Sequence, residues 1–318
     1  MGNGLMAMQL SKCTFCSGEA IYLRAYSGER YCKKCYIRTI EKHVQRTITK
    51  YKMLRPDDRV ALALSGGKDS ISLLQIMSSL EERFPQAKLV AITIDEGIAG
   101  YRSEAIRIAR ENCKKLGVEH HVYSFKKFYN HSLDEIVDAA RRSGKLFICS
   151  YCGILRRKAL NVAAREVQAT KLATAHNLDD ELQSIIMNFL RGDLYRLSSN
   201  VNELEKIKEL VPRIKPLSEV SERDVAFYAF LKKARFQSFL CPYMESSLRS
   251  DVRKFLNILE EKHAGMKFIT YKSFKKVQPL LKFPENRMLG LCQRCGEPTS
   301  GEVCLACKTL QDIGNIED

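Results

Sequence analysis

Short apolar runs alternate with longer amphipathic stretches through the middle of the chain. The runs at 59–65 (RVALALS) and 88–95 (KLVAITID) have the nearly continuous apolar character of buried strands. Between them, apolar residues at 71, 74 and 77, and at 73, 76 and 80, repeat with the period of a helix. The pattern then predicts helices at about 103–116 and 181–191, a strand at 118–125, and a strand and turn within 169–180.

This alternation predicts an α/β fold with a doubly wound, Rossmann-like parallel sheet. Such sheets bind ligands at the carboxyl ends of their strands. Three polar motifs follow predicted strands, namely SGGKDS (65–70), IDEG (94–97) and AHNLDD (175–180). We therefore expect these motifs to form one ligand site.

The motif SGGKDS has the properties of a phosphate-binding turn. Gly66 and Gly67 let the backbone approach a phosphate closely, and a helix that begins near Asp69 directs free N–H groups at it. Lys68 and a serine, Ser65 or Ser70, add charge and hydrogen bonds. The motif is not a Walker A loop, because GxxxxGK[ST] is absent. An ordinary strand-to-helix turn is the alternative.

Length and charge limit the class of protein. The chain has 318 residues, which corresponds to roughly two domains. No apolar run approaches the roughly 18 residues of a membrane span, and the start of the chain lacks the pattern of a signal peptide. We therefore expect a cytoplasmic protein without a membrane partner. The 52 Lys and Arg against 37 Asp and Glu give a net charge of +15, which favours a polyanionic partner such as nucleic acid.

Ten of the twelve cysteines fall in five C-x-x-C pairs. Two such pairs complete a tetrahedral zinc site, because each pair directs two thiolates at one ion. The first expected site is formed by Cys13, Cys16, Cys32 and Cys35, and the second by Cys292, Cys295, Cys304 and Cys307. The alternatives are redox dithiols, and zinc sites whose ligands are shared between the two ends of the chain.

The fifth pair, Cys149 and Cys152, has no partner pair. The remaining cysteines are Cys113, in a helical pattern, and Cys241, ahead of a proline in an expected loop. Three cysteines can hold three irons of a [4Fe-4S] cluster, with the fourth iron open. A C-x-x-C redox pair beside an unrelated cysteine is an equal alternative.

Several motifs, in this order along the chain, carry a resemblance to a known family. They are the N-terminal cysteine pairs, SGGKDS, IDEGIAGYR (94–102), CSYCGILRRKALN (149–161), AHNLDD, MNFLRGD (187–193), VPRIKPL (211–217) and the C-terminal cysteine pairs. The chain resembles the PP-loop ATP pyrophosphatases and, within them, the TtuA group of tRNA 2-thiolation enzymes. The resemblance implies a PP-loop fold flanked by zinc modules. The expected domains are a zinc-ribbon module with a basic helix (1–50), a catalytic domain with the Fe-S site (51–255), a basic linker (256–287) and a second zinc-ribbon module (288–318).

The resemblance also implies a reaction. The 2-carbonyl oxygen of a tRNA uridine attacks the α-phosphate of ATP, and sulfur then replaces the adenylated oxygen with release of AMP. It implies a [4Fe-4S] cluster on Cys149, Cys152 and Cys241 that holds the sulfur, with Lys68, Arg156 and Mg²⁺ stabilising the phosphate charge and Asp180 as the catalytic acidic residue. The implied ATP-binding residues are Ala63, Ser65, Gly66, Gly67, Lys68, Asp69, Ser70, Ile94, Arg156, Ala175 and Asp180. The family more commonly has Lys at the position of Arg156 and Gly at that of Ala175.

Some choices stay open. The implied sulfur donor is a ubiquitin-like carrier with a C-terminal thiocarboxylate or free sulfide, the assembly is a homodimer, and the uridine is in the T-loop or at the wobble position. A persulfide on Cys149 or Cys241 is an alternative to the cluster. Another PP-loop ligase or amidase, or a non-catalytic zinc-ribbon RNA-binding protein, is the alternative function.

Three acidic or basic residues at the strand ends have two interpretations each. His176 contacts ATP phosphate or is a satisfied histidine, and Asp95 and Glu96 orient Mg²⁺ or Arg102, or cap a helix. The candidate RNA contacts, each of which is otherwise a solvated surface residue, are Arg38, Lys42, His43, Arg46, Lys50, Lys52, Arg55, Arg141, Arg142, Lys145, Arg156, Arg157, Lys158, Lys272, Lys275, Lys276 and Lys282.

Overall fold

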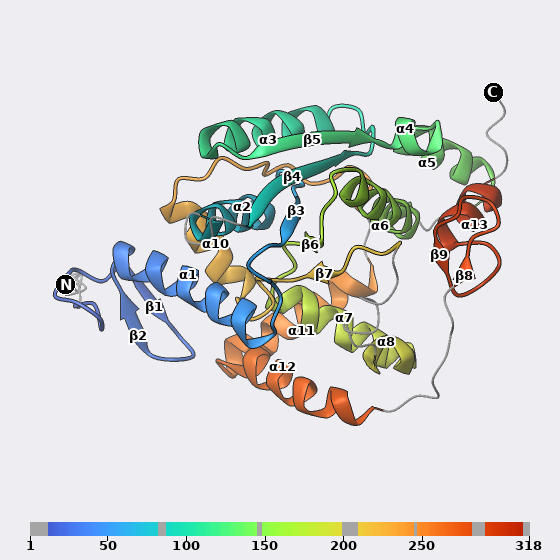
Figure 1. The fold of residues 1–318 in the computed structure, drawn as a ribbon. Coiled ribbons are helices and arrows are strands. Elements are labelled where there is room, and N and C mark those ends of the chain that lie inside the picture. The colour runs from blue at the N-terminus through green and yellow to red at the C-terminus, as the bar shows by residue number, and fades with distance from the viewer. Residues whose placement is uncertain are drawn as a thin grey trace, which may run out of the picture.

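The computed structural model describes residues 12–81, 87–144, 148–198, 209–244, 247–281 and 290–313. Its centre is a five-stranded sheet in the order β5-β4-β3-β6-β7, in which every neighbouring pair is parallel (Figure 1). The strands are β3 (Arg59–Ala63), β4 (Lys88–Asp95), β5 (Glu119–Ser124), β6 (Lys171–Ala173) and β7 (Arg213–Ile214). The predicted doubly wound parallel sheet is confirmed.

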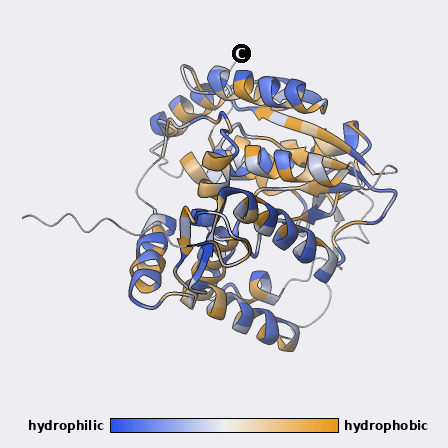
Figure 2. Cartoon of the chain, turned by 90° about the vertical axis from the view of Figure 1, so that its left-hand side faces the viewer, coloured by the Kyte–Doolittle hydropathy of each residue, from blue (hydrophilic) through white to orange (hydrophobic). Residues whose placement is uncertain are grey.

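Helices cover both faces of this sheet. Leu62 of β3 and Ala91 of β4 pack with α1 (Lys33–Lys50), α2 (Lys68–Glu81), α3 (Arg102–Leu116) and α10 (Glu222–Leu231). The intervening residues Ala61 and Val90 pack with α4 (Phe125–Tyr129), α5 (Leu133–Arg142) and α6 (Ile148–Glu166). Successive residues of a strand point to opposite faces, so an uninterrupted apolar strand serves two cores. Figure 2 shows these strands as hydrophobic and the surrounding helices as amphipathic.

A third group of helices lies below the sheet in Figure 1. It contains α7 (Leu178–Leu190), α8 (Leu194–Ser198), α11 (Leu248–Lys262) and α12 (Met266–Val277), followed by the short helix η1 (Gln278–Leu280). Leu178 and Leu182 of α7 pack with Val252 and Leu256 of α11 and with Tyr271 of α12. No helix in the described part of the chain is long and apolar enough to cross a bilayer.

Two small cysteine-containing modules lie at opposite ends of the molecule (Figure 1). The N-terminal module has the antiparallel strands β1 (Tyr22–Arg24) and β2 (Glu29–Tyr31) and leads into α1. The C-terminal module has β8 (Gly290–Leu291), β9 (Pro298–Thr299) and α13 (Leu305–Asp312), and α13 packs against α6.

The element boundaries follow the sequence pattern closely. Strand β4 spans the predicted 88–95, and α3 begins one residue before the predicted 103–116. Helix α7 begins at Leu178, three residues before the prediction, because the side chain of Asn177 accepts a hydrogen bond from the backbone N–H of Asp180. Capping thus moves the start of α7 into the AHNLDD motif.

The turn between β3 and α2 is fixed by a glycine in a left-handed conformation. Gly66 has φ +87°, and a Cβ atom there would lie 2.6 Å from the carbonyl oxygen of Ala105. The neighbouring Gly67 is not in the left-handed region, and a Cβ atom there would meet only Ser65 Oγ, at 3.6 Å. The two glycines of this turn therefore differ in how they tolerate a side chain.

We expect Gly66→Ala to lower the free energy of unfolding by at least about 2 kcal/mol, because alanine adds left-handed strain and a clash with backbone. Gly67→Ala is the matched control and should cost less than about 1 kcal/mol. Chemical denaturation of the two variants measures the difference. Equal stability of both variants would contradict the assigned conformation of this turn.

Candidate active site

A cleft of about 310 Å³ opens at the carboxyl edge of the sheet. Parallel strands end on one edge, so residues that follow β3, β4 and β6 meet there. The cleft is lined by Ala63, Leu64, Ser65, Gly67, Asp69, Ser70, Ile92, Ile94, Glu96, Arg102, Arg156, Leu160, Thr174, Ala175, His176 and Asp180. The three motifs thus lie together, as expected.

Nine of the eleven residues expected to bind ATP line this cleft, and Gly66 and Lys68 do not. The backbone of Gly66 turns away and accepts a hydrogen bond from the N–H of Gln237 at 2.9 Å. Ser65 Oγ and Ser70 Oγ lie 3.1 Å apart across the turn, and α2 begins directly after it. The first N–H groups of α2 therefore face the cleft without helical partners.

Lys68 is held by two carboxylates. Its Nζ lies 2.8 Å from Asp69 Oδ2 and 3.0 Å from Glu222 Oε1 at the start of α10. Burial alone would lower the pKa of Lys68, but Asp69 and Glu222 raise it. Arg253 of α11 also binds Glu222, at 2.8 Å. Glu222 lies 154 residues from Lys68 along the chain, and the sequence analysis did not include it.

Asp179 and Asp180 open α7 and have different surroundings. Asp180 shares a capping box with Asn177, and burial raises its pKa to about 6, with Asp69 and Glu222 adding to the effect. Asp179 is buried, accepts a hydrogen bond from the N–H of Glu222 at 2.7 Å and forms an ion pair with the buried Lys267 of α12. Asp180 therefore faces the cleft, whereas Asp179 links the start of α7 to α10 and α12.

Arg102 connects the carboxyl ends of β3 and β4 through hydrogen bonds. Its guanidinium donates to the carbonyl oxygens of Ile94 at 2.6 Å and Ser65 at 3.1 Å, and its Nε lies 2.6 Å from Glu96. Glu96 also lies 3.4 Å from Arg156 of α6. Of the two expected roles for Glu96, the pairing with Arg102 is the one observed.

Asp95 and His176 make local contacts. Asp95 Oδ1 accepts from the N–H of Gly97 at 2.9 Å. His176 lines the cleft, and its Nδ1 lies 2.9 Å from Thr174 Oγ1. Burial lowers the pKa of His176 to about 4, and the charge of Lys215 contributes, so the ring is neutral at neutral pH. It is a satisfied histidine that also faces the cleft.

Four lining residues were missed by the sequence analysis: Leu64, Ile92, Leu160 and Thr174. Leu64 directly follows β3, and Ile92 lies within β4, two strands that already carried predicted residues. Leu160 lies four residues after Arg156, which is one turn of α6, so helical spacing was the available signal.

Cys149, Cys152 and Cys241 lie near one another beside this cleft. Cys149 Sγ donates to the carbonyl oxygen of Tyr243 at 3.2 Å, which joins the start of α6 to the loop that carries Cys241. Burial raises the pKa of Cys152 to about 11, and the charges of Cys241 and Cys149 contribute. Cys113 is buried in α3, apart from them. Three soft thiol donors fit an iron-sulfur cluster. The carboxylate of Glu96 lies close enough for its charge to act on Cys152 and Cys241.

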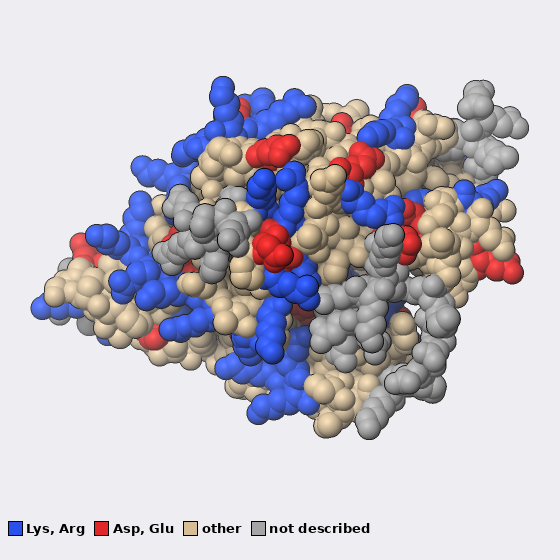
Figure 3. All heavy atoms as spheres, in the orientation of Figure 1, with Lys and Arg blue, Asp and Glu red and all other residues tan. Residues whose placement is uncertain are grey.

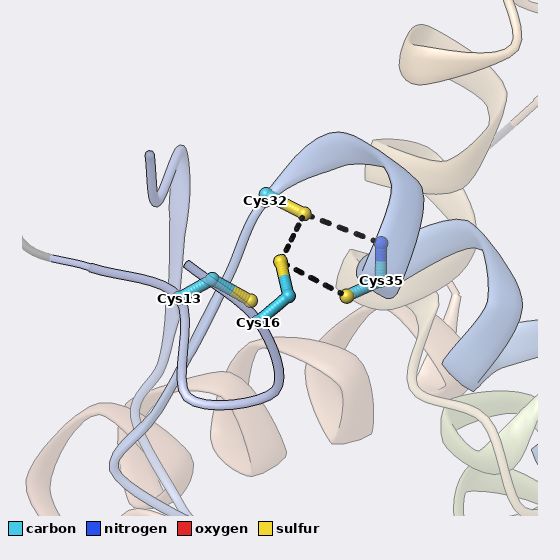
Figure 4. A group of neighbouring side chains, drawn as sticks. All are labelled: Cys13, Cys16, Cys32 and Cys35. Carbon is cyan, nitrogen blue, oxygen red and sulfur yellow. Dashed lines mark hydrogen bonds between the residues drawn. The ribbon is translucent and has the colours of Figure 1, made fainter. Parts of the chain in front are cut away.

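The other eight cysteines form two groups of four. Within each group, all sulfur atoms lie within 4.8 Å of one another, and no group mixes the two ends of the chain. Figure 4 shows the sulfur atoms of Cys13, Cys16, Cys32 and Cys35 pointing toward one point, with neighbouring pairs 3.6 Å apart. A tetrahedron of thiolates about 2.3 Å from an ion has edges of about 3.8 Å, so the spacing suits one metal ion.

The two cysteine modules are built alike. Cys32 caps α1 and Cys304 caps α13, and each sulfur accepts from the N–H three residues later. Burial alone would raise the pKa of Cys13 and of Cys292, but hydrogen bonds from backbone N–H groups lower it to about 6 in both. The backbone thus favours the thiolate form that metal binding requires.

Basic residues are spread over the surface. Figure 3 shows Lys and Arg over α1 and α12, with Asp and Glu in small separate groups. On α1, Arg38, Lys42 and Arg46 are exposed, while Tyr36 and Val44 are buried on the opposite side. Among the candidate RNA contacts, Lys145 and Lys282 lie outside the described residues.

Family models match most of the chain. A PP-loop domain matches residues 39–257, and the N-terminal LIM domain of the 2-thiouridine synthetase TtuA matches residues 12–37. The tRNA 2-thiolation protein NcsA of Haloferax volcanii is 34% identical, over 95% of this chain and 99% of that protein. The cytoplasmic tRNA 2-thiolation protein 1 of Anopheles gambiae is 34% identical, over 94% of this chain and 87% of that protein.

A solved structure agrees with these relatives. The U34-tRNA thiolase NcsA from Methanococcus maripaludis, determined with its [4Fe-4S] cluster, has a TM-score of 0.81 and 33% sequence identity. The match covers 98% of this chain and 99% of that one. The cleft with its SGGKDS turn, the two groups of four cysteines and these similarities lead to one conclusion: the chain belongs to the PP-loop family of tRNA 2-thiolation proteins that includes NcsA.

Proposed function

We propose that the protein is an ATP-dependent sulfurtransferase that converts a tRNA uridine to 2-thiouridine. The observation that carries the proposal is the meeting, at one edge of the sheet, of the phosphate-loop cleft, to which α6 contributes Arg156, and a site of three cysteines, of which α6 carries Cys149 and Cys152. The uridine we propose is U34, the position named for the Methanococcus maripaludis relative.

In the first step the 2-carbonyl oxygen of the uridine attacks the α-phosphorus of ATP. The bond between that phosphorus and the oxygen that bridges to the β-phosphorus breaks, and pyrophosphate leaves. The free N–H groups of α2, with Ser65 and Ser70, bind the phosphates, and the backbone at Ala63 and Ile94 contacts adenine. Lys68 exchanges its contacts with Asp69 and Glu222 for phosphate oxygens, and Arg156 offsets negative charge at the rim.

In the second step sulfur bonds to carbon 2 of the uridine, and AMP departs with the former carbonyl oxygen. Cys149, Cys152 and Cys241 would hold a [4Fe-4S] cluster. When bound, that group supplies a Lewis-acidic iron that keeps the sulfur donor anionic. Arg156, which carries a raised pKa because Cys152 and Glu96 outweigh the effect of burial, stays cationic between the two halves of the site.

The other proposed metal ions follow from the ligand atoms that the protein offers. We propose one Zn²⁺ in each group of four cysteines, where it stabilises a module too small to have a large core. Asp180, with Asp69 nearby, is the proposed carboxylate for Mg²⁺ that accompanies ATP. The proposed sulfur donor is a thiocarboxylated ubiquitin-like carrier or sulfide, and the proposed assembly is a cytoplasmic homodimer.

We expect 2-thiouridine to form only when ATP and Cys149 are both present. Protein reconstituted with iron and sulfide without oxygen is incubated with unmodified tRNA, ATP, Mg²⁺ and sulfide, and the digested RNA is read by mass spectrometry. Cys149→Ala should lose at least about a hundredfold in rate, because one of three cluster ligands is removed. Cys113→Ala is the matched control, because that thiol is buried in α3, and should retain activity.

Other outcomes of this experiment would change different parts of the proposal. Product that appears with a thiocarboxylated carrier but not with sulfide changes the donor and keeps the reaction. Product from Cys149→Ala and Cys152→Ala proteins would exclude the cluster. No product from either donor would contradict the thiolase function and favour another PP-loop ligase or amidase.

We expect Asp180→Asn to stabilise the fold while it removes activity. Burial raises the pKa of Asp180 from 3.8 to about 6, so the folded state binds the proton more tightly than the unfolded state. The free energy of unfolding of the wild type should fall as the pH rises through this interval. The gain in that free energy from Asp180→Asn should therefore be larger at pH 7.5 than at pH 5. Denaturation in Mg²⁺-free buffer at the two pH values measures it.

The adjacent Asp179→Asn is the control with the opposite sign. It leaves the buried Lys267 without a carboxylate partner and should cost about 3 kcal/mol. Equal changes in the free energy of unfolding from the two substitutions would show that the different surroundings of Asp179 and Asp180 do not determine the effect.

A further inference from the structure

Four arginines from four separate elements lie together beside the cleft. They are Arg157 of α6, Arg196 of α8, Arg213 of β7 and Arg249 of α11, and we call them the arginine cluster. Arg213 Nη2 donates to the carbonyl oxygen of Arg157 at 2.8 Å. Burial lowers the pKa of Arg157, and the charges of Arg156, Arg196 and Arg249 lower it further. Burial and the charge of Arg157 lower the pKa of Arg213 to about 10.

The cluster has few acidic partners. Among the described residues, no carboxylate oxygen lies within 4.0 Å of the guanidinium nitrogens of Arg157 or Arg213. Arg249 reaches Asp180 at 4.0 Å, and Arg196 pairs with the aspartate three residues before it at 3.2 Å. Arg213 is half-buried, and Arg157, Arg196 and Arg249 are exposed. Like charges gathered in this way repel one another and attract an anion to the space between them.

The cluster lies next to residues that line the cleft. Arg156, next to Arg157 on α6, lines the cleft, and so does Asp180, the acid that Arg249 reaches. The cleft residue His176 also lies within the field of Arg249 and Arg213. The loop that is proposed to bind ATP phosphates lies on β3 and α2 instead. None of the four arginines is among the residues proposed to bind ATP, and β7, which carries Arg213, is separated from β3 by β6.

Exposed aromatic side chains lie near the arginine cluster. Phe189 near the end of α7 is 71% exposed and Tyr195 of α8 is 48% exposed. Tyr195 is adjacent to Arg196 in sequence, and α7 contacts α8. Unpaired nucleobases stack on such rings, while forked guanidinium groups bind phosphate oxygens two at a time. An acidic peptide would match the charge of the arginines but would leave the rings without a function.

We propose that the arginine cluster binds the phosphates that flank the reacting uridine in a single-stranded loop of the tRNA, with neighbouring bases stacked on Phe189 and Tyr195; this inference rests on the proposed thiolase function. The base must enter the cleft for carbon 2 to react, so its backbone stays at the rim. The cluster residues are positioning residues, since they hold the nucleotide rather than act on the reacting atoms.

The test measures the affinity of the full-length protein for labelled, unmodified tRNA between about 50 and 200 mM salt. Arg157→Gln with Arg213→Gln should weaken binding about tenfold and reduce the slope of log affinity against log salt by about 2. Arg157→Lys with Arg213→Lys should keep the slope and regain part of the affinity, because the charge remains but the fork is lost. Phe189→Ala with Tyr195→Ala should weaken binding and leave the slope unchanged, because stacking releases no counterions.

Arg107→Gln with Arg110→Gln is the matched control. It removes the same charge from α3, which packs on β4 and β5 at the edge of the sheet opposite β7. It should keep both the affinity and the slope near those of the wild type. Because Arg213→Gln also removes a hydrogen bond, unfolding curves accompany each variant. If the double variant does not fold, the single variant Arg157→Gln replaces it. That variant keeps the carbonyl oxygen of residue 157, which accepts the hydrogen bond from Arg213.

Three results would overturn the proposal, and they differ from one another. Wild-type affinity and slope in the Arg157→Gln, Arg213→Gln protein, with active wild-type enzyme, would overturn the arginine cluster alone. A wild-type protein that neither binds nor thiolates tRNA would overturn the proposed function as well. Unchanged tRNA binding with lost sulfur transfer from a thiocarboxylated carrier would make the cluster a docking site for an acidic protein instead.

Discussion

Three helix N-termini meet around the ammonium group of Lys68, and the carboxyl edge of the sheet depends on how their charges balance. Helices α2, α7 and α10 each begin there, and the N-terminus of a helix favours negative charge. Asp69, Asp180 and Glu222 supply that charge, and the pKa of Asp180 is raised by burial, with the charges of Asp69 and Glu222 adding to the effect. Lys68 lies between Asp69 and Glu222 and makes the arrangement stable. A triphosphate carries more negative charge into the same space, so its binding must displace carboxylates from Lys68 or bring a cation with it. The Mg²⁺ ion that is proposed to accompany ATP would supply such a cation.

The same turn of α10 connects this edge to the N-terminal cysteine module. Glu222 faces Lys68, while Asp224, two residues later, accepts a hydrogen bond from Tyr36 of α1 at 2.8 Å and lies 3.6 Å from Arg24 of β1. A metal ion that holds the four cysteines would fix β1, β2 and the start of α1 relative to one another, and through Asp224 it would fix the first turn of α10. The module therefore helps to hold the phosphate loop in place. Loss of a metal ion from the module should disturb the contacts of Lys68 as well as the surface of the module.

The parts of this structure that the sequence predicted share a local cause. The strand at 88–95 and the turn at SGGKDS are determined by apolar character and by glycine, and both were found where the pattern placed them. The three motifs met because parallel strands must end on one edge, which is a property of the fold class and not of any particular residue. Glu222 was not predicted, because the sequence around it is that of an ordinary first helical turn. Only the folded chain brings it to Lys68. Of the arginine cluster only Arg157 was among the candidate RNA contacts. Arg196, Arg213 and Arg249 were not predicted, since each comes from a different element and alone has the character of a surface residue.

Helix α6 explains why the two halves of the proposed reaction can act on one base. Cys149, Cys152 and Arg156 occupy positions i, i+3 and i+7 of this helix, so they lie along one stripe, and Leu160 extends the stripe into the cleft by one further turn. Four residues of helix rise about 6 Å, so the thiol of Cys152 and the guanidinium of Arg156 are one turn apart. Carbon 2 of a uridine and its carbonyl oxygen are directly bonded to each other. An enzyme that activates the oxygen from one side and delivers sulfur to the carbon from the other must therefore hold its nucleotide site and its sulfur site within about one helical turn. Helix α6 contributes residues to both sites, so one rigid element sets their spacing without any domain movement.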